Sequence, residues 1–201
     1  MTTDLEARLA QHALWLETLG HEGVQLEVVR ADLRGVDLSG RDLSESIVYE
    51  SNLDGAKLRE AELYGARFSG TSLVDADLER TQFPKAAFDS TKLQAARLVG
   101  AKANRTGFQD ADLRQADLTG ADLRGASSTR ADLRGARLRE AQLENAVLDG
   151  TRVHGADFYG VSGLDAAHVT SIDVGEREPE PLQGDAARAW LIARVGGRSS
   201  P

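Results

Sequence analysis

Residues 111–125 read ADLRQ, ADLTG and ADLRG in succession, three copies of a five-residue unit with alanine first and leucine third. The frame extends in both directions without a slip: every fifth residue from Val28 to Phe158 is apolar or small, and Ser128 is the one polar member. Two places before each of these central residues lies a second series, which is almost always Ala, Ser or Thr. A large and a small side chain therefore recur at fixed positions over most of the chain.

A period of five fits neither regular secondary structure. Five steps along a helix of 3.6 residues per turn rotate a side chain by about 140°, and five steps along a strand move it to the opposite face. For all central residues to share one interior, the chain must turn once in each pentapeptide, which predicts a solenoid with a continuous core. Glycine often stands two places after the central residue, as at Gly120 and Gly125, where a tight corner favours a residue that accepts positive φ.

The units quoted above resemble the A-(D/N)-L-x-x signature of the pentapeptide repeat family. This resemblance implies an all-β solenoid, a right-handed quadrilateral β-helix with one pentapeptide on each of four sides and twenty residues per coil. Residues twenty apart should then stack on one another. At an inter-strand spacing of about 4.8 Å, the repeats would form a rod on the order of 30 Å long.

Stacking sorts the side chains into columns. One column is aromatic, and we interpret it as core packing; it contains Phe68, Phe88 and Phe108. A second, outward column alternates in charge at every step, so that neighbours attract and support the register; it comprises Asp37, Lys57, Asp77, Arg97, Asp117, Arg137 and Asp157. A third side carries the fewest charges and is a candidate contact surface; its outer positions include Ile47, Tyr49, Ala87, Gly107 and Val147.

The composition indicates one soluble, cytoplasmic domain. The 201 residues carry a formal net charge of −8 and include no Cys, so disulfides and thiolate chemistry are excluded. No apolar run has the length of a membrane span or the character of a signal peptide. The charge is uneven, because residues 31–95 hold 12 acids and 8 bases, whereas residues 96–160 hold 9 acids and 10 bases.

The N-terminal end differs from the repeats. Residues 3–19 are expected to form a helix with Thr3 or Asp4 as its N-cap and Gly20 as its stop. We expect segment 1–25 to cap the first coil, since an open solenoid end exposes core and unpaired backbone. The apolar stripe of the helix would consist of Leu5, Leu9, His12, Leu16 and Leu19.

The repeat frame breaks after Gly160, which sets the C-terminal boundaries. The β-helix is expected over 26–163, followed by an irregular segment over 164–183 that includes an extended Glu-Pro linker at 176–181. A C-terminal helix and tail would occupy 184–201, with Asp185 as the N-cap. The apolar residues of this helix would pack either on the last coil or on a second copy of the chain, giving a monomer or a homodimer through the C-terminal helix; these candidate cap or dimer contacts are Trp190, Leu191 and Val195.

The sequence shows no group of residues typical of a catalytic site. The four histidines are widely separated, at His12, His21, His154 and His168. The recurring Asp before the central Leu is typical of hydrogen bonding to nearby backbone, and the glycines are typical of turns rather than a phosphate loop. Basic residues are interleaved with acids and lack aromatic platforms. We therefore expect no enzyme activity, no catalytic, cofactor or metal site, and no direct contact with nucleic acid or membrane.

Two function classes remain open. The resemblance implies a DNA mimic, because the family includes fluoroquinolone-resistance and antibiotic self-resistance proteins whose rods resemble B-DNA and occupy the DNA-binding saddle of DNA gyrase or topoisomerase IV. In this chain the acidic first half would carry that role, through Asp32, Asp42, Glu45, Glu50, Asp54, Glu60, Glu62, Asp75 and Glu79. The near-balanced charge after residue 95 departs from such a mimic. The alternative is a structural or scaffolding module that docks an unidentified protein partner on a rigid face.

Overall fold

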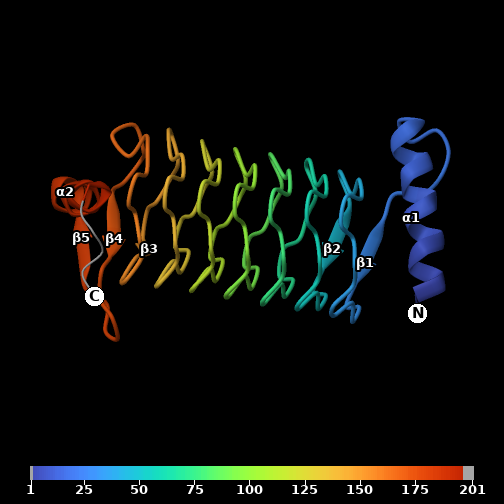
Figure 1. Ribbon diagram of the computed structural model, residues 1–201, viewed down its shortest axis with the longest axis horizontal. Helices are drawn as coiled ribbons and strands as arrows, with labels where there is room; N and C mark the ends of the chain where they lie inside the picture. Colours follow the sequence, from blue (N-terminus) through green and yellow to red (C-terminus); the bar gives the residue numbers. More distant parts are fainter. Residues whose placement is uncertain (1, 197–201) are drawn as a thin grey trace.

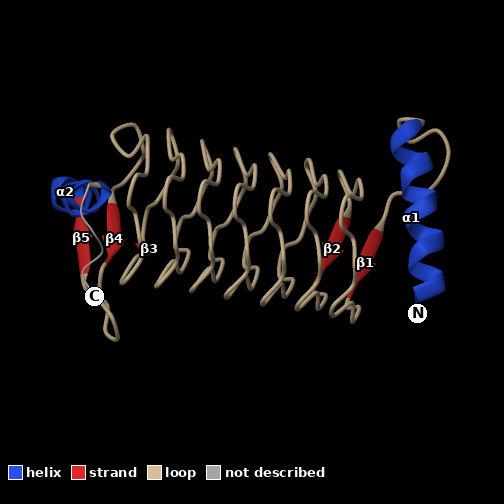
Figure 2. Ribbon diagram, viewed as in Figure 1, coloured by secondary structure: helices blue, strands red, loops and turns tan. Residues whose placement is uncertain are grey.

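The computed structural model describes residues 2–196 and forms a rod closed by a helix at each end (Figure 1). Helix α1 (Thr2–Glu17) precedes strands β1 (Glu27–Val29) and β2 (Ile47–Tyr49), which pair in parallel. After the central coils follow β3 (Thr151–Arg152), β4 (Ser171–Asp173), β5 (Pro181–Gln183) and helix α2 (Gly184–Val195). Between β2 and β3 the coils consist of turns joined by isolated bridges rather than continuous strands (Figure 2).

Parallel bridges between residues twenty apart confirm the predicted period of the coil. Asp112 bridges Asp132, for example, and Arg97 bridges Asp117. Each step is held by a pair of backbone hydrogen bonds: the Leu113 amide donates to the Asp132 carbonyl at 2.8 Å, and the Asp132 amide donates to the Ala111 carbonyl at 2.9 Å. The same pattern repeats on all four sides, so every coil is bonded to the next around its whole circumference.

The two inward series form one continuous core. The central leucines and the alanines two places earlier are almost completely buried, as Leu113 and Ala116 illustrate, and Ser128 is buried with them. The aromatic column packs as predicted: the Phe68 and Phe88 rings are stacked with centroids 5.2 Å apart, and the Phe88 and Phe108 centroids are 5.9 Å apart.

Threonine is tolerated at the small inward position because its hydroxyl finds a carbonyl in the preceding coil. Thr91 Oγ1 donates to the Phe68 carbonyl at 3.0 Å, and Thr106 Oγ1 donates to the Phe83 carbonyl at 2.7 Å. The same bond to the carbonyl 23 residues earlier is made by Thr71, Thr81 and Thr151. A buried hydroxyl is thus satisfied at each of these five sites.

Every fifth residue from Arg30 to Gly160 has a positive φ, which places the corner of each pentapeptide in the left-handed region. Glycine occupies many of these corners, as predicted, with φ of 66° at Gly120. The others hold ordinary L residues, such as Ala95 with φ of 55° and Gln115 with φ of 60°. The repetition of the turn therefore imposes this conformation even on residues that disfavour it.

Helix α1 lies across the open end of the first coil and buries Leu5, Leu9 and His12, as predicted (Figure 1). The predicted end of its stripe is wrong: the helix stops at Glu17, and Leu19 has φ of 54° and is 89% exposed. The segment after the helix turns back on α1, where the Val24 amide donates to the Gln11 carbonyl at 3.1 Å. The helix already includes Thr2, one residue before the predicted start.

The C-terminal segment continues the stack with one extra residue, which corrects the expected irregular linker over 164–183. Val147 bridges His168, a spacing of 21 instead of 20, and Leu164 fills the core one place late. Strands β3 and β4 are parallel, whereas β4 and β5 form an antiparallel hairpin with Asp173 opposite Pro181. The Glu-Pro stretch over 176–181 is therefore the turn of a hairpin and the start of an edge strand, not an extended linker.

Helix α2 packs over the end of this hairpin (Figure 1). Ala187 and Leu191 are buried, and the Gly160 amide donates to the Val195 carbonyl at 2.9 Å. The predicted N-cap is wrong, because Gln183 is the residue before the first turn and Asp185 lies inside that turn. An acidic side chain there still faces the positive end of the helix dipole.

Candidate partner-binding surface

Three of the nine candidate carboxylates gather on one side of the first two coils. Asp42 bridges Glu62 in register, so the two acidic side chains stack, and Glu45 lies at the adjoining corner. All three are exposed. Within the described chain, none of them forms an ion pair, and Asp42 Oδ1 accepts a hydrogen bond only from the Ser44 amide, at 2.9 Å. We call Asp42, Glu45 and Glu62 the acidic face.

Four other candidates are neutralised by arginine. Glu79 is the most enclosed, since its Oε2 lies 3.1 Å from Arg59 and 3.0 Å from Arg97. The remaining ion pairs are Asp32 with Arg34, Glu50 with Arg30, and Glu60 with Arg80. These four carboxylates therefore contribute less to the external field than their number suggests.

The last two candidates are isolated from the acidic face. Asp54 Oδ1 accepts hydrogen bonds from Ser72 Oγ at 2.5 Å and from the Val74 amide at 3.0 Å, which ties one coil to the next. Asp75 is an exposed corner residue with φ of 55°. The structure thus brings three of the nine candidate residues together on one side.

A local Asp-Leu-Arg motif neutralises much of the second half, and sequence reasoning missed it. In Asp122-Leu123-Arg124, Arg124 Nε and Nη2 donate to the two carboxylate oxygens of Asp122 at 2.8 and 2.7 Å. The same fork is formed by Asp32 with Arg34, Asp112 with Arg114, and Asp132 with Arg134. The Arg124 guanidinium lowers the pKa of Asp122 below its usual range despite partial burial. The signal in the sequence was the repeated DLR triplet.

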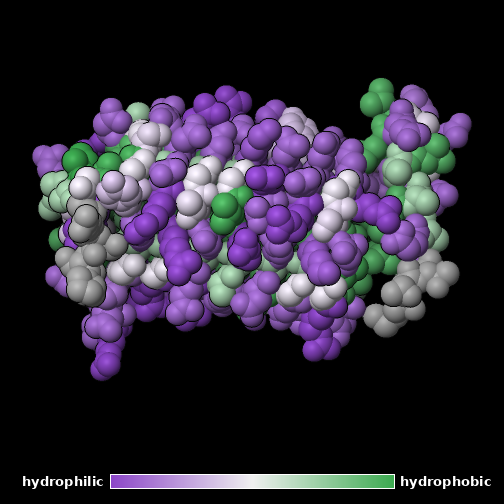
Figure 3. Space-filling view, in the orientation of Figure 1, coloured by the Kyte–Doolittle hydropathy of each residue, from purple (hydrophilic) through white to green (hydrophobic). Residues whose placement is uncertain are grey.

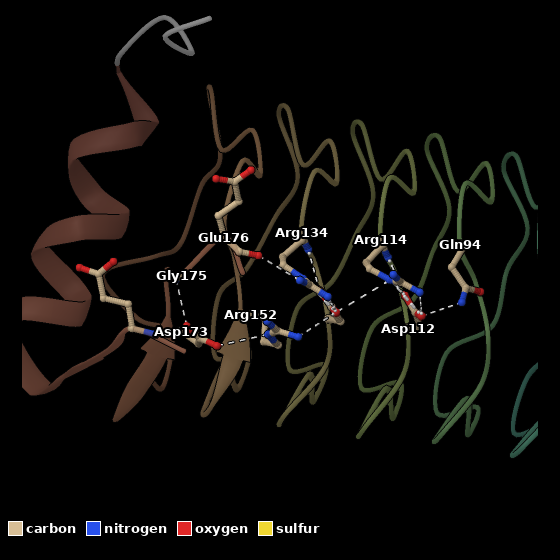
Figure 4. Close-up of polar contacts among 10 residues, drawn as sticks. Gln94, Asp112, Arg114, Arg134, Arg152, Asp173, Gly175 and Glu176 are labelled. Atoms are coloured by element: carbon tan, nitrogen blue, oxygen red, sulfur yellow. Dashed lines mark hydrogen bonds and ion pairs between the residues drawn. The ribbon is translucent and has the colours of Figure 1, made fainter. Parts of the chain in front are cut away.

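These forks join into a network along the C-terminal half of one side (Figure 4). The Asp132 carboxylate lies 2.6 Å from Arg134 and 3.6 Å from Arg152, and Arg152 in turn lies 3.2 Å from Asp173. Asp173 Oδ1 accepts the amides of Gly175 and Glu180, which fixes the hairpin turn. The network therefore fastens the β4–β5 hairpin to the repeats.

The alternating column has the predicted register, from Asp37 through Asp157. Ion pairs within the column occur at three of its steps: Asp37 with Lys57, Asp77 with Arg97, and Asp117 with Arg137, at 3.8, 4.0 and 3.6 Å. At Asp157 the partner is instead Arg139, from the turn of the preceding coil, at 2.5 Å. The column contributes to register, with each exposed pair contributing only about 0–1 kcal/mol.

The candidate contact side of low charge is flat and bears small side chains over its later coils. Ile47, Ala87, Gly107 and Val147 are partly exposed, and Tyr49 is 47% exposed. In the space-filling view, hydrophilic side chains cover most of the rod and hydrophobic ones gather toward its two ends (Figure 3).

The three candidate cap or dimer residues contact the rod's own core. Leu191 is 1% exposed, and Trp190 and Val195 are partly buried against the same cluster. The Arg194 guanidinium lies 3.4 Å from the centre of the Trp190 ring. Beside them Ile192, which the sequence analysis did not single out, is 50% exposed.

Residues 2–196 hold no group of three or more His, Asp and Glu side chains that could bind a metal ion. In the same part of the chain no helix has the length and apolar character needed to cross a membrane.

Comparison with solved structures gives matches among pentapeptide repeat proteins. HetL, involved in heterocyst differentiation regulation in the cyanobacterium Nostoc sp. strain PCC 7120, is 28% identical, with a TM-score of 0.45 over 78% of this chain and 90% of HetL. Trypsin-treated QnrB1, a plasmid-mediated fluoroquinolone resistance protein, is 18% identical, with a TM-score of 0.46 over 87% of this chain and 100% of that one. A protein from the Arabidopsis thaliana thylakoid lumen is 24% identical, with a TM-score of 0.25 over 82% and 90% of the two chains.

No curated protein sequence matches this chain. The sequence model of the family "Pentapeptide repeats", however, matches in eight copies, over residues 31–73, 61–98, 91–127 and 129–162. Together these segments account for more than half of the 201 residues. The chain therefore belongs to the pentapeptide repeat family.

Proposed function

We propose that the protein is a non-enzymatic, cytoplasmic rod that binds another protein through its acidic face, acting as a DNA mimic toward DNA gyrase or topoisomerase IV. The observation that carries this proposal is the stacking of Asp42 on Glu62 beside Glu45, which puts three exposed carboxylates together with no ion pair among the described residues. A basic DNA-binding groove is attracted to such a row of unneutralised charge.

The rigidity of the rod supports a binding role. Each coil is hydrogen-bonded to the next on all four sides, and the core is continuous from Val28 to Ile172. A preformed surface of this kind loses little conformational entropy on association. The acidic face also lies near one end of the rod, where a partner could approach it without contacting the balanced second half.

The test is a measurement of gyrase binding, by calorimetry or surface plasmon resonance, with the double variant Asp42→Lys/Glu62→Lys. We expect affinity to fall by roughly tenfold or more and its dependence on ionic strength to weaken, because the removed charges contribute through long-range attraction. The matched control is Glu140→Lys/Glu178→Lys, which makes the same charge change at two exposed acids of the second half.

Wild-type protein that shows no gyrase or topoisomerase IV binding at low salt would contradict the DNA-mimic proposal. Equal losses in the two double variants would contradict the assignment to the acidic face. A supercoiling assay with and without a fluoroquinolone then measures whether binding protects the enzyme.

A scaffolding function is the second candidate, and the flat side of low charge favours it. Ala87 and Val147 present small, uncharged side chains on this side, which a partner could contact without desolvating a charge. Replacing Ala87 and Val147 with Glu would place two charges on this side and should abolish such docking while leaving gyrase binding unchanged.

A further inference from the structure

Helix α1 is attached to the first coil by a narrow stripe. Only Leu5, Leu9 and His12 are buried among its residues beyond Thr3. Two open grooves adjoin the helix: one is lined by Ala7, Arg8 and Gln11 with the chain over 24–27, and the other by Leu5 and Arg8 with residues of 28–37. The cap is thus held by fewer buried side chains than any coil of the rod.

His12 lies within this buried stripe, and its hydrogen bonding defines the protonation state of its ring. Its side chain is fully buried, and Nδ1 accepts a hydrogen bond from the Leu26 amide at 3.0 Å. An amide can donate only to an unprotonated nitrogen, so the ring is neutral and carries its proton on Nε2. Nε2 is buried without a partner among the described residues, as is Ser46 Oγ of the first coil.

Protonation of His12 is incompatible with this arrangement. A proton on Nδ1 would remove the acceptor of the Leu26 amide and leave two donors facing each other. It would also place a positive charge in a buried interface. The charged groups that act on the ring from the first coil are Asp42 and Glu45, and on α1 the ring stacks on Trp15 at 5.8 Å. Burial lowers the pKa of His12 below its usual value and outweighs Asp42, the Ser44 backbone and Glu45, which favour the charged ring.

We propose that α1 is a proton-released cap: protonation of His12 detaches the helix from the first coil and uncovers the end of the rod. Release would expose Leu26, whose amide is bonded to His12, and Val28, which lines a groove with Leu5, together with the edge of β1 that β2 does not occupy. The remaining coils would keep their structure, because each is bonded to the next independently of α1. This proposal is independent of any partner of the acidic face.

The test follows amide hydrogen exchange of the full chain from pH 7.5 to 5.0, corrected for the intrinsic pH dependence of exchange. We expect protection of α1 and β1 to fall by up to tenfold per pH unit below about pH 6.5, while peptides from residues 100–140 keep theirs. The key variant is His12→Asn, whose Oδ1 can accept from the Leu26 amide but does not titrate; its α1 protection should not change with pH. The control is His21→Asn, which removes an exposed histidine beside the cap and should behave as wild type.

Constant protection of α1 down to pH 5.0 in the wild type would overturn the proposal, as would an equal fall in His12→Asn. If His12→Asn detaches the cap even at pH 7.5, NMR of the wild-type protein tests the proposal instead. The ¹⁵N shifts of the His12 ring must report the neutral Nε2–H form at pH 7.5, and the ring must titrate with the same midpoint as the loss of α1 protection. A different tautomer or a different midpoint would refute it.

Discussion

Each pentapeptide combines a buried central side chain with a corner residue in the left-handed region. For an L residue this corner conformation costs roughly 1–2 kcal/mol, whereas glycine adopts it freely. At Gly120 a Cβ would meet no atom within 4 Å, so the backbone conformation alone decides the effect of a substitution there.

Gly120→Ala should therefore lower the free energy of unfolding by about 1 kcal/mol, and Ala95→Gly should raise it by a similar amount. The two substitutions are mirror images, because Ala95 occupies the same kind of corner with φ of 55°. Chemical denaturation with each purified variant measures both values. Destabilisation by Ala95→Gly would show that unfolded-state entropy outweighs the strain at the corner.

A second residue-scale prediction concerns the difference between inward and outward positions. Leu113→Asp buries a charge in a continuous core and should cost several kcal/mol. Asp112→Ala should cost about 1–2 kcal/mol, more than an ordinary surface substitution, because Asp112 accepts hydrogen bonds from Arg114 and Gln94. Thermal unfolding of the two variants should separate them clearly; equal losses would contradict the assignment of the two positions.

The sequence predicted which residues point inward, because a period of five leaves one arrangement that buries all the leucines. It did not predict which acids remain free. Asp112 could pair with Arg114 two residues away or with Lys92 one coil away, and the choice depends on side-chain geometry that a column of letters does not contain. The structure therefore reduces the candidate binding residues from nine to the three of the acidic face.

At the scale of elements, the sequence predicts a helix at each end, and both helices are present with boundaries that differ by one or two residues from the predicted ones. The failure at the C-terminal end has a physical cause: one inserted residue shifts the frame by one, so Leu164 and Val169 remain buried although they leave the five-residue series. The Glu-Pro composition predicts a linker at Pro181, yet this residue begins an edge strand, where its missing N–H is tolerated. Local composition does not distinguish a linker from a coil with one inserted residue or from an edge strand.

The packing of α2 predicts the effect of removing it. Deleting residues 184–201 should lower the melting temperature, because Leu191 leaves the core and Arg188 no longer donates to the carbonyls of Asp165 and Ala167. Light scattering should give the same number of chains per particle before and after the deletion, since the buried face of α2 is already occupied by its own rod.

The point variants refine this expectation. Leu191→Ala should reproduce most of the destabilisation, by about 2–5 kcal/mol, whereas Ile192→Ala at the exposed side should have little effect. If the wild type is a dimer and either the deletion or Ile192→Ala converts it to a monomer, α2 is an interface between copies as well as a cap.

At the scale of the whole molecule, the two kinds of titrating group predict an acid response in two separate stages. Asp112, Asp122, Asp157 and Asp173 have pKa values lowered by their hydrogen bonds and ion pairs, so the unfolded chain binds their protons more readily. Their contribution to stability is complete above about pH 4 and is lost as the pH falls further. His12 is a base whose pKa is lowered by burial, so it is neutral in the folded protein. Its contribution to stability is complete above about pH 6.5, and it is lost as the pH falls from that value to the pKa in the folded state.

The first stage should be local, confined to α1 and the first coil, and the second should be global, because the four carboxylates lie in stacked coils that are hydrogen-bonded to the rest of the rod. Far-UV circular dichroism at 222 nm should therefore report loss of helix signal between about pH 6.5 and 5, before the coils unfold below about pH 4. High salt should weaken the second stage more than the first, since the forks are partly exposed whereas His12 is enclosed. A single transition in which α1 and the coils unfold together would mean that the cap and the rod are one cooperative unit.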